Sequence, residues 1–353
     1  MTNGNHTLNE ILTQANAWED ALQAFYAMSA RIQSAWQALQ PQQVVFTGCG
    51  STHYLSQTAA ELFQSLTSVP SRAYPASEIA LYPQSVLTDP AHTLLIAVSR
   101  SGATTETIQA IKRFEQAGGA AVWSITCYPN SPIAQSSALI LLAEAGQEES
   151  VAQTRSFASM LVLAQALAAL LGAEDVLQLK QLPNLGRQLI AETESQMKTL
   201  GSDAGLERFF FLGSGLQYGI ANEAMLKMKE MSLSHSEAFH FMEFRHGPMS
   251  MVNQKALVVG LLSQQTHRYE QKVLSEMKTL GGRILSLTTE EPADGSAYHI
   301  TLPKNLPAWA MPALYLPPLQ LLAYYRAVSK GLNPDNPRNL TAVVYLDETE
   351  FEA

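Results

Sequence analysis

Glycines recur along this chain at a nearly constant interval, and that spacing constrains the fold more than any other feature. The turn Gly48–Gly50 ends the apolar run VVFTG, and Gly213–Gly215 ends RFFFLG after an offset of 165 residues. Gly118–Gly119 precedes the run AAVWSITC, and Gly281–Gly282 precedes RILSLTT after an offset of 163 residues. Landmarks that keep almost one offset indicate an internal duplication of one structural unit.

Each copy alternates apolar runs with helix-like segments. In the first copy, helix-like segments that end near Leu66 and Gln116 separate the apolar runs. Strands that alternate with helices predict a parallel, doubly wound α/β sheet of the flavodoxin-like kind in each copy. A simpler alternative places all the strands in one large sheet. The expected strands are 44–48, 93–99, 120–127, 208–215, 256–263 and 283–289.

The length of 353 residues suits two domains of common size. A long helix is expected over 154–171, before a hinge near 172–205. The C-terminal part predicts a helix over 316–330 and a last strand, TAVVYL, over 341–346. The predicted organisation is a helical lead (1–40), a first α/β domain (41–175), a helical linker (176–205), a second α/β domain (206–332) and a C-terminal tail (333–353).

Charge and cysteine content disfavour several classes of function. The formal net charge is −9 and no Lys/Arg cluster occurs, which argues against nucleic-acid and anionic-membrane partners. The two cysteines, Cys49 and Cys127, lie far apart and form neither a disulfide framework nor a zinc spacing. The N-terminus does not read as a signal peptide, and no apolar run makes a clean membrane span. We expect a soluble, cytoplasmic protein without a cofactor.

The turn SRSGATTET begins where an expected strand ends and a helix starts. Free backbone N–H groups and the positive end of the helix dipole meet there, which favours a bound phosphate. Hydroxyl donors come from Ser99, Ser101 and Thr104, and Ser51 and Thr52 lie on the other turn at the same sheet edge. Alternatively, these residues only cap the helix. Neither turn has a Walker A or G-x-G-x-x-G pattern, so a small monophosphate fits better than a nucleotide.

The second copy carries the residues suited to acid–base chemistry. Lys227 and Glu230 lie three apart on an expected helix, and His246 opens a His-Gly-Pro turn. A surface ion pair and an exposed imidazole are the simpler interpretations. With a sugar phosphate bound, however, Glu230 could move a proton between C1 and C2, and His246 could open the hexose ring near neutral pH. This enediol route needs no metal.

Taken together, these motifs resemble the sugar-isomerase (SIS) superfamily, and most closely the isomerase half of glucosamine-6-phosphate synthase. The resemblance covers essentially the whole chain and includes TGCGSTHY, SRSGATTET, ESVAQTRSFASMLVL and the run from 211 to 252. The stretch FRHGP is also similar to AgaS-type amino-sugar-phosphate enzymes.

The resemblance implies an enzyme with a sugar phosphate as substrate and two SIS domains. It implies Glu230 as the proton-transfer base and His246 as the ring-opening residue, supplied by a neighbouring subunit of a homodimer. The remaining residues that it places at the phosphate or the sugar are Ser51, Thr52, Ser99, Arg100, Ser101, Thr104, Glu148, Val151 and Lys227.

Two departures from the synthase indicate a subtype. Residue 2 is Thr rather than the nucleophilic Cys of a glutaminase domain, which we expect to be missing. Ala342 stands where the synthase has the lysine that forms a Schiff base with fructose 6-phosphate. The leading hypothesis is therefore an amino-sugar-6-phosphate deaminase that converts glucosamine 6-phosphate to fructose 6-phosphate and ammonia. An aldose–ketose isomerase, a fructosamine-6-phosphate deglycase and a non-catalytic sugar-phosphate sensor remain alternatives.

Overall fold

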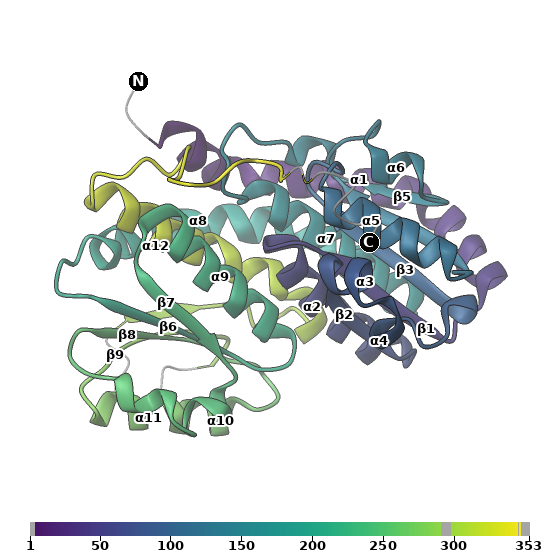
Figure 1. Cartoon of the computed structure of the whole chain (residues 1–353). Coiled ribbons are helices and arrows are strands. Elements are labelled where there is room, and N and C mark those ends of the chain that lie inside the picture. Colours follow the sequence, from purple (N-terminus) through teal and green to yellow (C-terminus); the bar gives the residue numbers. More distant parts are fainter. Residues whose placement is uncertain (1–3, 291–297, 345, 347–353) are drawn as a thin grey trace. The chain divides into compact units, whose positions relative to one another are not determined.

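A computed structural model describes residues 4–290, 298–344 and 346 (Figure 1). The chain forms two compact units. The first unit contains Thr13–Glu148, Gln153–Pro183 and the described residues from Thr341 onward. The second unit contains the described residues up to Leu12, Glu149–Ala152 and those of Asn184–Leu340. None of the helices among the described residues has an apolar stretch long enough to cross a membrane.

The first unit is built around a five-stranded parallel sheet of order β2-β1-β3-β4-β5. Its strands are β1 (Gln43–Gly48), β2 (Ser71–Pro75), β3 (Thr93–Ser99), β4 (Ala121–Thr126) and β5 (Leu139–Leu142). Its helices are α2 (Ser51–Thr67), α3 (Ala76–Leu81), α4 (Pro83–Val86), α5 (Thr105–Gln116), α6 (Pro132–Gln135) and α7 (Arg155–Leu171). Most of the long helix α1 (Asn5–Leu39) also belongs to this unit.

Side chains that alternate along the strands cover both faces of this sheet. Val45 packs in a cluster with Ile79 of α3 and Ile111 of α5. The next residue, Phe46, faces the other way and meets the ring of Phe63 of α2 at 5.8 Å. Because successive strand residues point to opposite faces, an unbroken apolar run such as VVFTG predicts a strand covered by helices on both sides.

The second unit repeats this architecture with the sheet order β10-β9-β8-β6-β7, again all parallel (Figure 1). Its strands are β6 (Arg208–Gly213), β7 (His235–Phe239), β8 (Ala256–Leu261), β9 (Arg283–Thr288) and β10 (Tyr298–Thr301). Its helices are α8 (Leu182–Gly201), α9 (Leu216–Ser232), α10 (Phe241–Phe244), α11 (His267–Thr279) and α12 (Leu316–Ser329). The doubly wound α/β prediction is confirmed, and the alternative of a single large sheet is wrong.

The recurrent glycines do the same structural work in both units. A Cβ on Gly48 would lie 2.6 Å from the Thr52 hydroxyl, and one on Gly213 would overlap the Gln217 carbonyl, so the following helix can start close to its strand. Gly50 and Gly215, which precede α2 and α9, have φ of +54° and +56°. Side chains with a Cβ are disfavoured in that region. The offset in sequence therefore reflects one repeated strand–turn–helix geometry.

The short elements depart most from the sequence prediction. The edge strands β2, β5, β7 and β10 have four or five residues each and were not predicted. The last strand expected over 341–346 does not form among its described residues, and Tyr345 lies outside them. Instead, the Val344 carbonyl and the Leu346 amide face Thr105 of α5. The 20-residue helix α8 lies within the segment 176–205, for which a helical linker was expected.

Candidate functional site

The hydroxyl-rich turn after β3 is folded on itself. Ser99 Oγ accepts a hydrogen bond from the Gly102 amide at 3.1 Å and lies 3.4 Å from Thr104 Oγ1. Ser101 Oγ accepts one from the Ala103 amide at 3.2 Å. The structure thus brings the three predicted hydroxyls together in one turn, at the carboxyl end of a central strand. We call Ser99–Thr104 the anion turn.

The helix that follows the anion turn is not capped by its own N-cap residue. Thr104 occupies the N-cap position of α5 but makes no capping hydrogen bond with its side chain. The capping alternative is therefore not the arrangement seen here. The first-turn amide of Thr105 faces the Val344 carbonyl at 3.5 Å, which is too long for a strong hydrogen bond. The N-terminal amides and the dipole of this 12-residue helix favour an anion.

The order of the strands makes the carboxyl ends of β1 and β3 a suitable place for a ligand. β1 and β3 are neighbours in the sheet, and β1 also pairs with β2 on its other side. The chain therefore reverses its winding direction between β1 and β3, and ligands of open α/β sheets bind outside the strand ends at such a point. The turn after β1 is the Gly48–Gly50 turn, and the turn after β3 is the anion turn.

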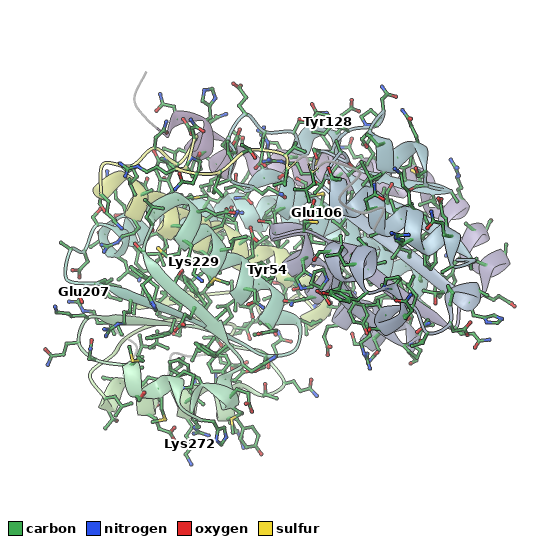
Figure 2. The ribbon with its side chains drawn as sticks, viewed as in Figure 1. Tyr54, Glu106, Tyr128, Glu207, Lys229 and Lys272 are labelled. Atoms are coloured by element: carbon green, nitrogen blue, oxygen red, sulfur yellow. The ribbon has the colours of Figure 1, made fainter. Side chains whose placement is uncertain are left out.

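The predicted residues of the turn after β1 are largely engaged within it. Thr52 Oγ1 accepts a hydrogen bond from the Cys49 amide at 2.9 Å and donates to the Cys49 carbonyl at 3.0 Å. Ser51 is 5% exposed. Burial raises the pKa of the Cys49 thiol to about 11, and Glu106 in the first turn of α5 (labelled in Figure 2) adds to the effect. In this structure Thr52 therefore stabilises the turn, and Cys49 stays protonated at neutral pH.

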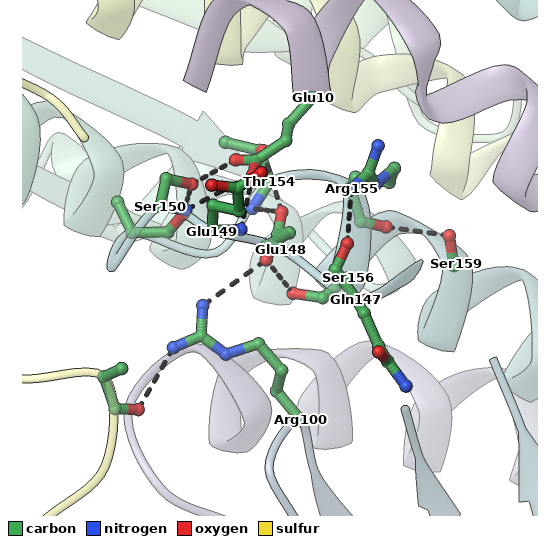
Figure 3. Close-up of polar contacts among 12 residues, drawn as sticks. Glu10, Arg100, Gln147, Glu148, Glu149, Ser150, Thr154, Arg155, Ser156 and Ser159 are labelled. Atoms are coloured by element: carbon green, nitrogen blue, oxygen red, sulfur yellow. Dashed lines mark hydrogen bonds and ion pairs between the residues drawn. The ribbon is translucent and has the colours of Figure 1, made fainter. Parts of the chain in front are cut away.

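Arg100, from the anion turn, forms an ion pair with Glu148 (Figure 3). Their side chains are 8% and 0% exposed, and Nη1 of Arg100 lies 3.4 Å from Oε2 of Glu148. Nη2 of Arg100 donates to the Ala342 carbonyl at 3.0 Å. The structure thus brings together two predicted ligand residues, and they contact each other.

Val151 lies in the second unit. Its amide donates to the Asp335 carbonyl at 3.0 Å, and its side chain is partly exposed. Asp335 also binds the start of α1, since its carboxylate accepts hydrogen bonds from the amides of Gly4 and Thr7 at 3.1 and 2.8 Å. The loop before Val151 is held by Glu10, whose carboxylate accepts the Glu149 amide at 2.7 Å (Figure 3).

Helix α9 places Lys227 between two carboxylates. Lys227 is 1% exposed, and its Nζ contacts Oε2 of Glu230 and lies 3.4 Å from Oε1 of the buried Glu223. The Glu230 side chain keeps 19% of its surface exposed. By contrast, Lys229, which is two positions after Lys227 and is labelled in Figure 2, is exposed. The predicted i, i+3 pair therefore forms, but its lysine is buried rather than on the surface, and Glu230 is held while its carboxylate remains accessible.

His246 follows α10 and is exposed. Gly247 after it has φ of +128°, so the chain turns sharply there. The neighbouring Arg245 forms an ion pair with Glu276 of α11 at 2.6 Å, which fixes the turn to the second unit. Among the described residues no hydrogen bond or ion pair joins the His246 side chain to Glu230.

The second unit has its own polar turn after β8, which the sequence prediction missed. Ser263 Oγ and Thr266 Oγ1 lie 2.7 Å apart. The buried Glu270 of α11 accepts hydrogen bonds from the Ser263 amide and the Thr266 hydroxyl, both at 2.7 Å. Burial raises the pKa of Glu270, and these hydrogen bonds oppose the shift. An internal carboxylate thus occupies the polar turn of the second unit.

Comparison with known proteins identifies the family. The SIS domain family matches residues 39–170 and 204–330, one match in each sheet. This chain belongs to the SIS family. The glutamine–fructose-6-phosphate aminotransferase (isomerizing) of Pseudomonas putida is 31% identical over 320 residues, which cover 87% of this chain and 52% of that protein. The chain thus spans about half the length of this SIS relative.

Two solved SIS structures extend the comparison over nearly the whole chain. A glucosamine-6-phosphate deaminase from Thermotoga maritima is 27% identical with a TM-score of 0.80, covering 97% of this chain and 100% of that one. A tagatose-6-phosphate ketose/aldose isomerase from Escherichia coli has a TM-score of 0.87 at 23% identity, covering 98% of both chains. At that identity, the isomerase supports the fold alone.

Proposed function

We propose that this chain is an amino-sugar-6-phosphate deaminase, which converts glucosamine 6-phosphate and water to fructose 6-phosphate and ammonia. The observation that carries the proposal is the match to the Thermotoga maritima deaminase, which covers 97% of this chain and 100% of that one. It agrees with the sequence at Ala342, where the synthase that the chain resembles has its Schiff-base lysine. A deaminase does not need to capture a ketose as an imine, so alanine is acceptable there.

The proposal assigns anion binding to the first unit. The phosphate of the sugar would accept hydrogen bonds from Ser99, Ser101 and Thr104 and from the amides at the start of α5. These hydroxyls now bond to their own turn at 3.1 to 3.4 Å, and they can rotate toward a stronger acceptor. A dianionic phosphate is such an acceptor.

Proton transfer is assigned to residues of the second unit. His246 would donate a proton to the ring oxygen as a general acid and open the hexose. Glu230 would take the C2 proton of the open-chain amino aldehyde and give an enolamine. Return of that proton to C1 gives an imine at C2, and water adds to it and releases ammonia. Lys227 would keep the Glu230 carboxylate oriented through their ion pair.

We further propose that the chain works as a homodimer in which His246 serves the partner's substrate. The exposure of His246 and the lack of a recorded contact with Glu230 among the described residues support this. Mixing equal amounts of purified Glu230→Gln and His246→Asn proteins, after exchange of subunits, would then restore up to about a quarter of the wild-type rate. About half of the dimers would be mixed, and each mixed dimer would carry one intact site of two. A mixture as inactive as its parts would contradict this subunit arrangement.

The decisive experiment measures nitrogen release. Purified protein is incubated with glucosamine 6-phosphate, galactosamine 6-phosphate, fructose 6-phosphate and a 6-phosphorylated fructosyl-lysine, and ammonia and fructose 6-phosphate are assayed separately. We expect ammonia and fructose 6-phosphate in equal amounts from a hexosamine phosphate. Glu230→Gln should abolish both, whereas the matched change Glu237→Gln on β7 should leave them.

Three results would contradict the deaminase proposal. Interconversion of aldose and ketose phosphates without ammonia would indicate an isomerase. Release of lysine from the fructosyl-lysine alone would indicate a deglycase. Tight binding of a hexosamine phosphate without any turnover would indicate a sensor.

A further inference from the structure

Arg100 lies between two of the predicted phosphate ligands, Ser99 and Ser101, yet its side chain is 8% exposed and lies against other parts of the first unit. Among its contacts, the guanidinium lies 3.4 Å from the Glu148 carboxylate and donates to the Ala342 carbonyl at 3.0 Å. Arg100 thus links the turn to Glu148 and Ala342, which lie 48 and 242 positions later in the chain.

Glu148 is a firm anchor for that guanidinium. Its side chain is fully buried. One carboxylate oxygen accepts the Thr154 amide at 2.7 Å and the Thr154 hydroxyl at 2.9 Å, and the other accepts the Ser156 hydroxyl (Figure 3). These donors come from the start of α7, so Glu148 also satisfies one of the amides that a helix leaves unpaired at its N-terminus. These hydrogen bonds fix the orientation of the carboxylate, which in turn fixes the side chain that it pairs with.

The chain near Ala342 contacts both Arg100 of the anion turn and Thr105 at the start of α5. We call its described residues, 341–344 and 346, the C-terminal segment. Beyond the Arg100 bond, the recorded links are from the Leu346 amide to the Thr105 hydroxyl at 3.1 Å and from the Thr105 amide to the Val344 carbonyl at 3.5 Å. Of these three hydrogen bonds between described residues, the one from Arg100 has a charged donor, which makes it the strongest of the three.

We propose that Arg100 is a positioning residue, which Glu148 orients and which holds the C-terminal segment beside the anion turn through the Ala342 carbonyl. The proposal rests on the proposed function. It gives the main chain at position 342, rather than its side chain, the structural role. The C-terminal segment then forms a wall next to the phosphate, and Arg100 improves substrate binding through that wall without contacting the phosphate itself.

The first experiment compares Arg100→Gln with Arg113→Gln, which changes an arginine at the far end of α5. Hydrogen exchange of the C-terminal segment is followed by mass spectrometry, and kcat and KM are measured with glucosamine 6-phosphate. In Arg100→Gln we expect exchange to speed up about tenfold and KM to rise about tenfold, with kcat within about threefold, as for loss of one charge-assisted hydrogen bond. Arg113→Gln should match wild type. Unchanged exchange and KM in Arg100→Gln would overturn the proposal.

A truncation separates positioning from direct phosphate binding. When the chain ends at Leu340, the segment is gone and KM should already be raised. Adding Arg100→Gln to that truncated chain should then change KM by less than about twofold, because both changes remove one function. A further tenfold rise would show that Arg100 binds the phosphate directly, and would overturn the proposal.

Loss of Arg100 alone leaves the Glu148 charge buried without its partner, which can prevent folding. The double variant Arg100→Gln/Glu148→Gln removes both charges and keeps both shapes, and it should show the same faster exchange. Because exchange needs no turnover, the two proposals can fail separately. Faster exchange in an enzyme that releases no ammonia would contradict the deaminase and support the role of Arg100. Ammonia release together with unchanged exchange and KM in Arg100→Gln would support the deaminase and contradict the role of Arg100.

Discussion

The polar turns after β3 and β8 occupy equivalent places in two copies of one fold, but different groups fill them. In the first unit, the hydroxyls of Ser99 and Ser101 bond to amides of their own turn. In the second, the Ser263 amide and the Thr266 hydroxyl bond to the carboxylate of Glu270. A buried carboxylate would repel an incoming phosphate. The comparison teaches that a duplicated strand–turn–helix need not duplicate a ligand site, because an internal side chain can take the ligand's place.

If the first unit binds the phosphate and the second unit transfers protons, removing the base should lower kcat more than any other change. Substrate binding at the anion turn should be preserved. We expect Glu230→Gln to lower kcat about 10²- to 10⁴-fold, the usual range for a general base. Binding of glucosamine 6-phosphate, measured by calorimetry, should change little. The exposed neighbour Lys229→Met serves as the control and should keep its rate. A Glu230→Gln protein with near-normal kcat would remove this residue from the mechanism.

The same double substitution in the two polar turns tests the comparison directly. Ser101→Ala/Thr104→Val should raise KM for the sugar phosphate about 10- to 100-fold, because each hydroxyl would donate to a charged oxygen. Ser263→Ala/Thr266→Val should leave KM within about twofold, although it can lower stability. Steady-state kinetics of the two variants are sufficient. An equal rise in KM from both would mean that the polar turn of the second unit also binds substrate.

Where the copies are alike, matched substitutions should have matched effects. Gly50→Ala and Gly215→Ala each place a Cβ at φ near +55°, and the space around both positions is open. We expect each to lower the free energy of unfolding by about 1–2 kcal/mol through backbone strain alone. Denaturant titration would measure both. A loss in one variant and none in the other would break the equivalence of the two turns.

The smallest effect concerns the pH dependence of stability. The pKa of Glu270 is raised by burial from its ordinary value of 4.5, so the folded protein holds this proton more tightly than the unfolded chain. The stability that this proton gives is present below pH 4.5 and is lost as pH rises through the higher folded-state pKa. As pH rises from 4.5 through the folded-state pKa of Glu270, the Glu270→Gln variant should therefore lose less stability than wild type. The melting temperatures of both proteins at several pH values would show this difference. A parallel pH profile in the two proteins would contradict this role.

Features that depend on local pattern could be predicted from the sequence. The central strands are apolar runs, the glycines mark sharp turns, and α7 (Arg155–Leu171) closely matches the helix expected over 154–171. Met225, Met228 and Met231 of α9, which are spaced three apart as on one face of a helix, are buried. The short edge strands lack such a pattern because pairing with a neighbour, rather than their own composition, makes them strands.

Features that depend on distant partners could not be predicted. Arg100 reads as a phosphate ligand because it lies in a hydroxyl-rich turn, and nothing local reveals that Glu148 will bury it. Glu270 was overlooked because it lies one helical turn beyond Thr266, on a helix that also reads as an ordinary exposed element. The expected last strand failed because an apolar run of β-formers needs a strand to pair with, and its described residues meet a helix end instead.

Contact between Asp335 and the amides of Gly4 and Thr7 has a consequence for biosynthesis. The two sides of this contact are separated by 331 and 328 residues, so the beginning of α1 cannot dock until Asp335 has left the ribosome. The stretch from Thr13 to Pro183, which holds the entire first sheet, can assemble earlier, since nascent domains fold as they emerge. A circular permutant that joins the two old ends and opens elsewhere would remove this delay.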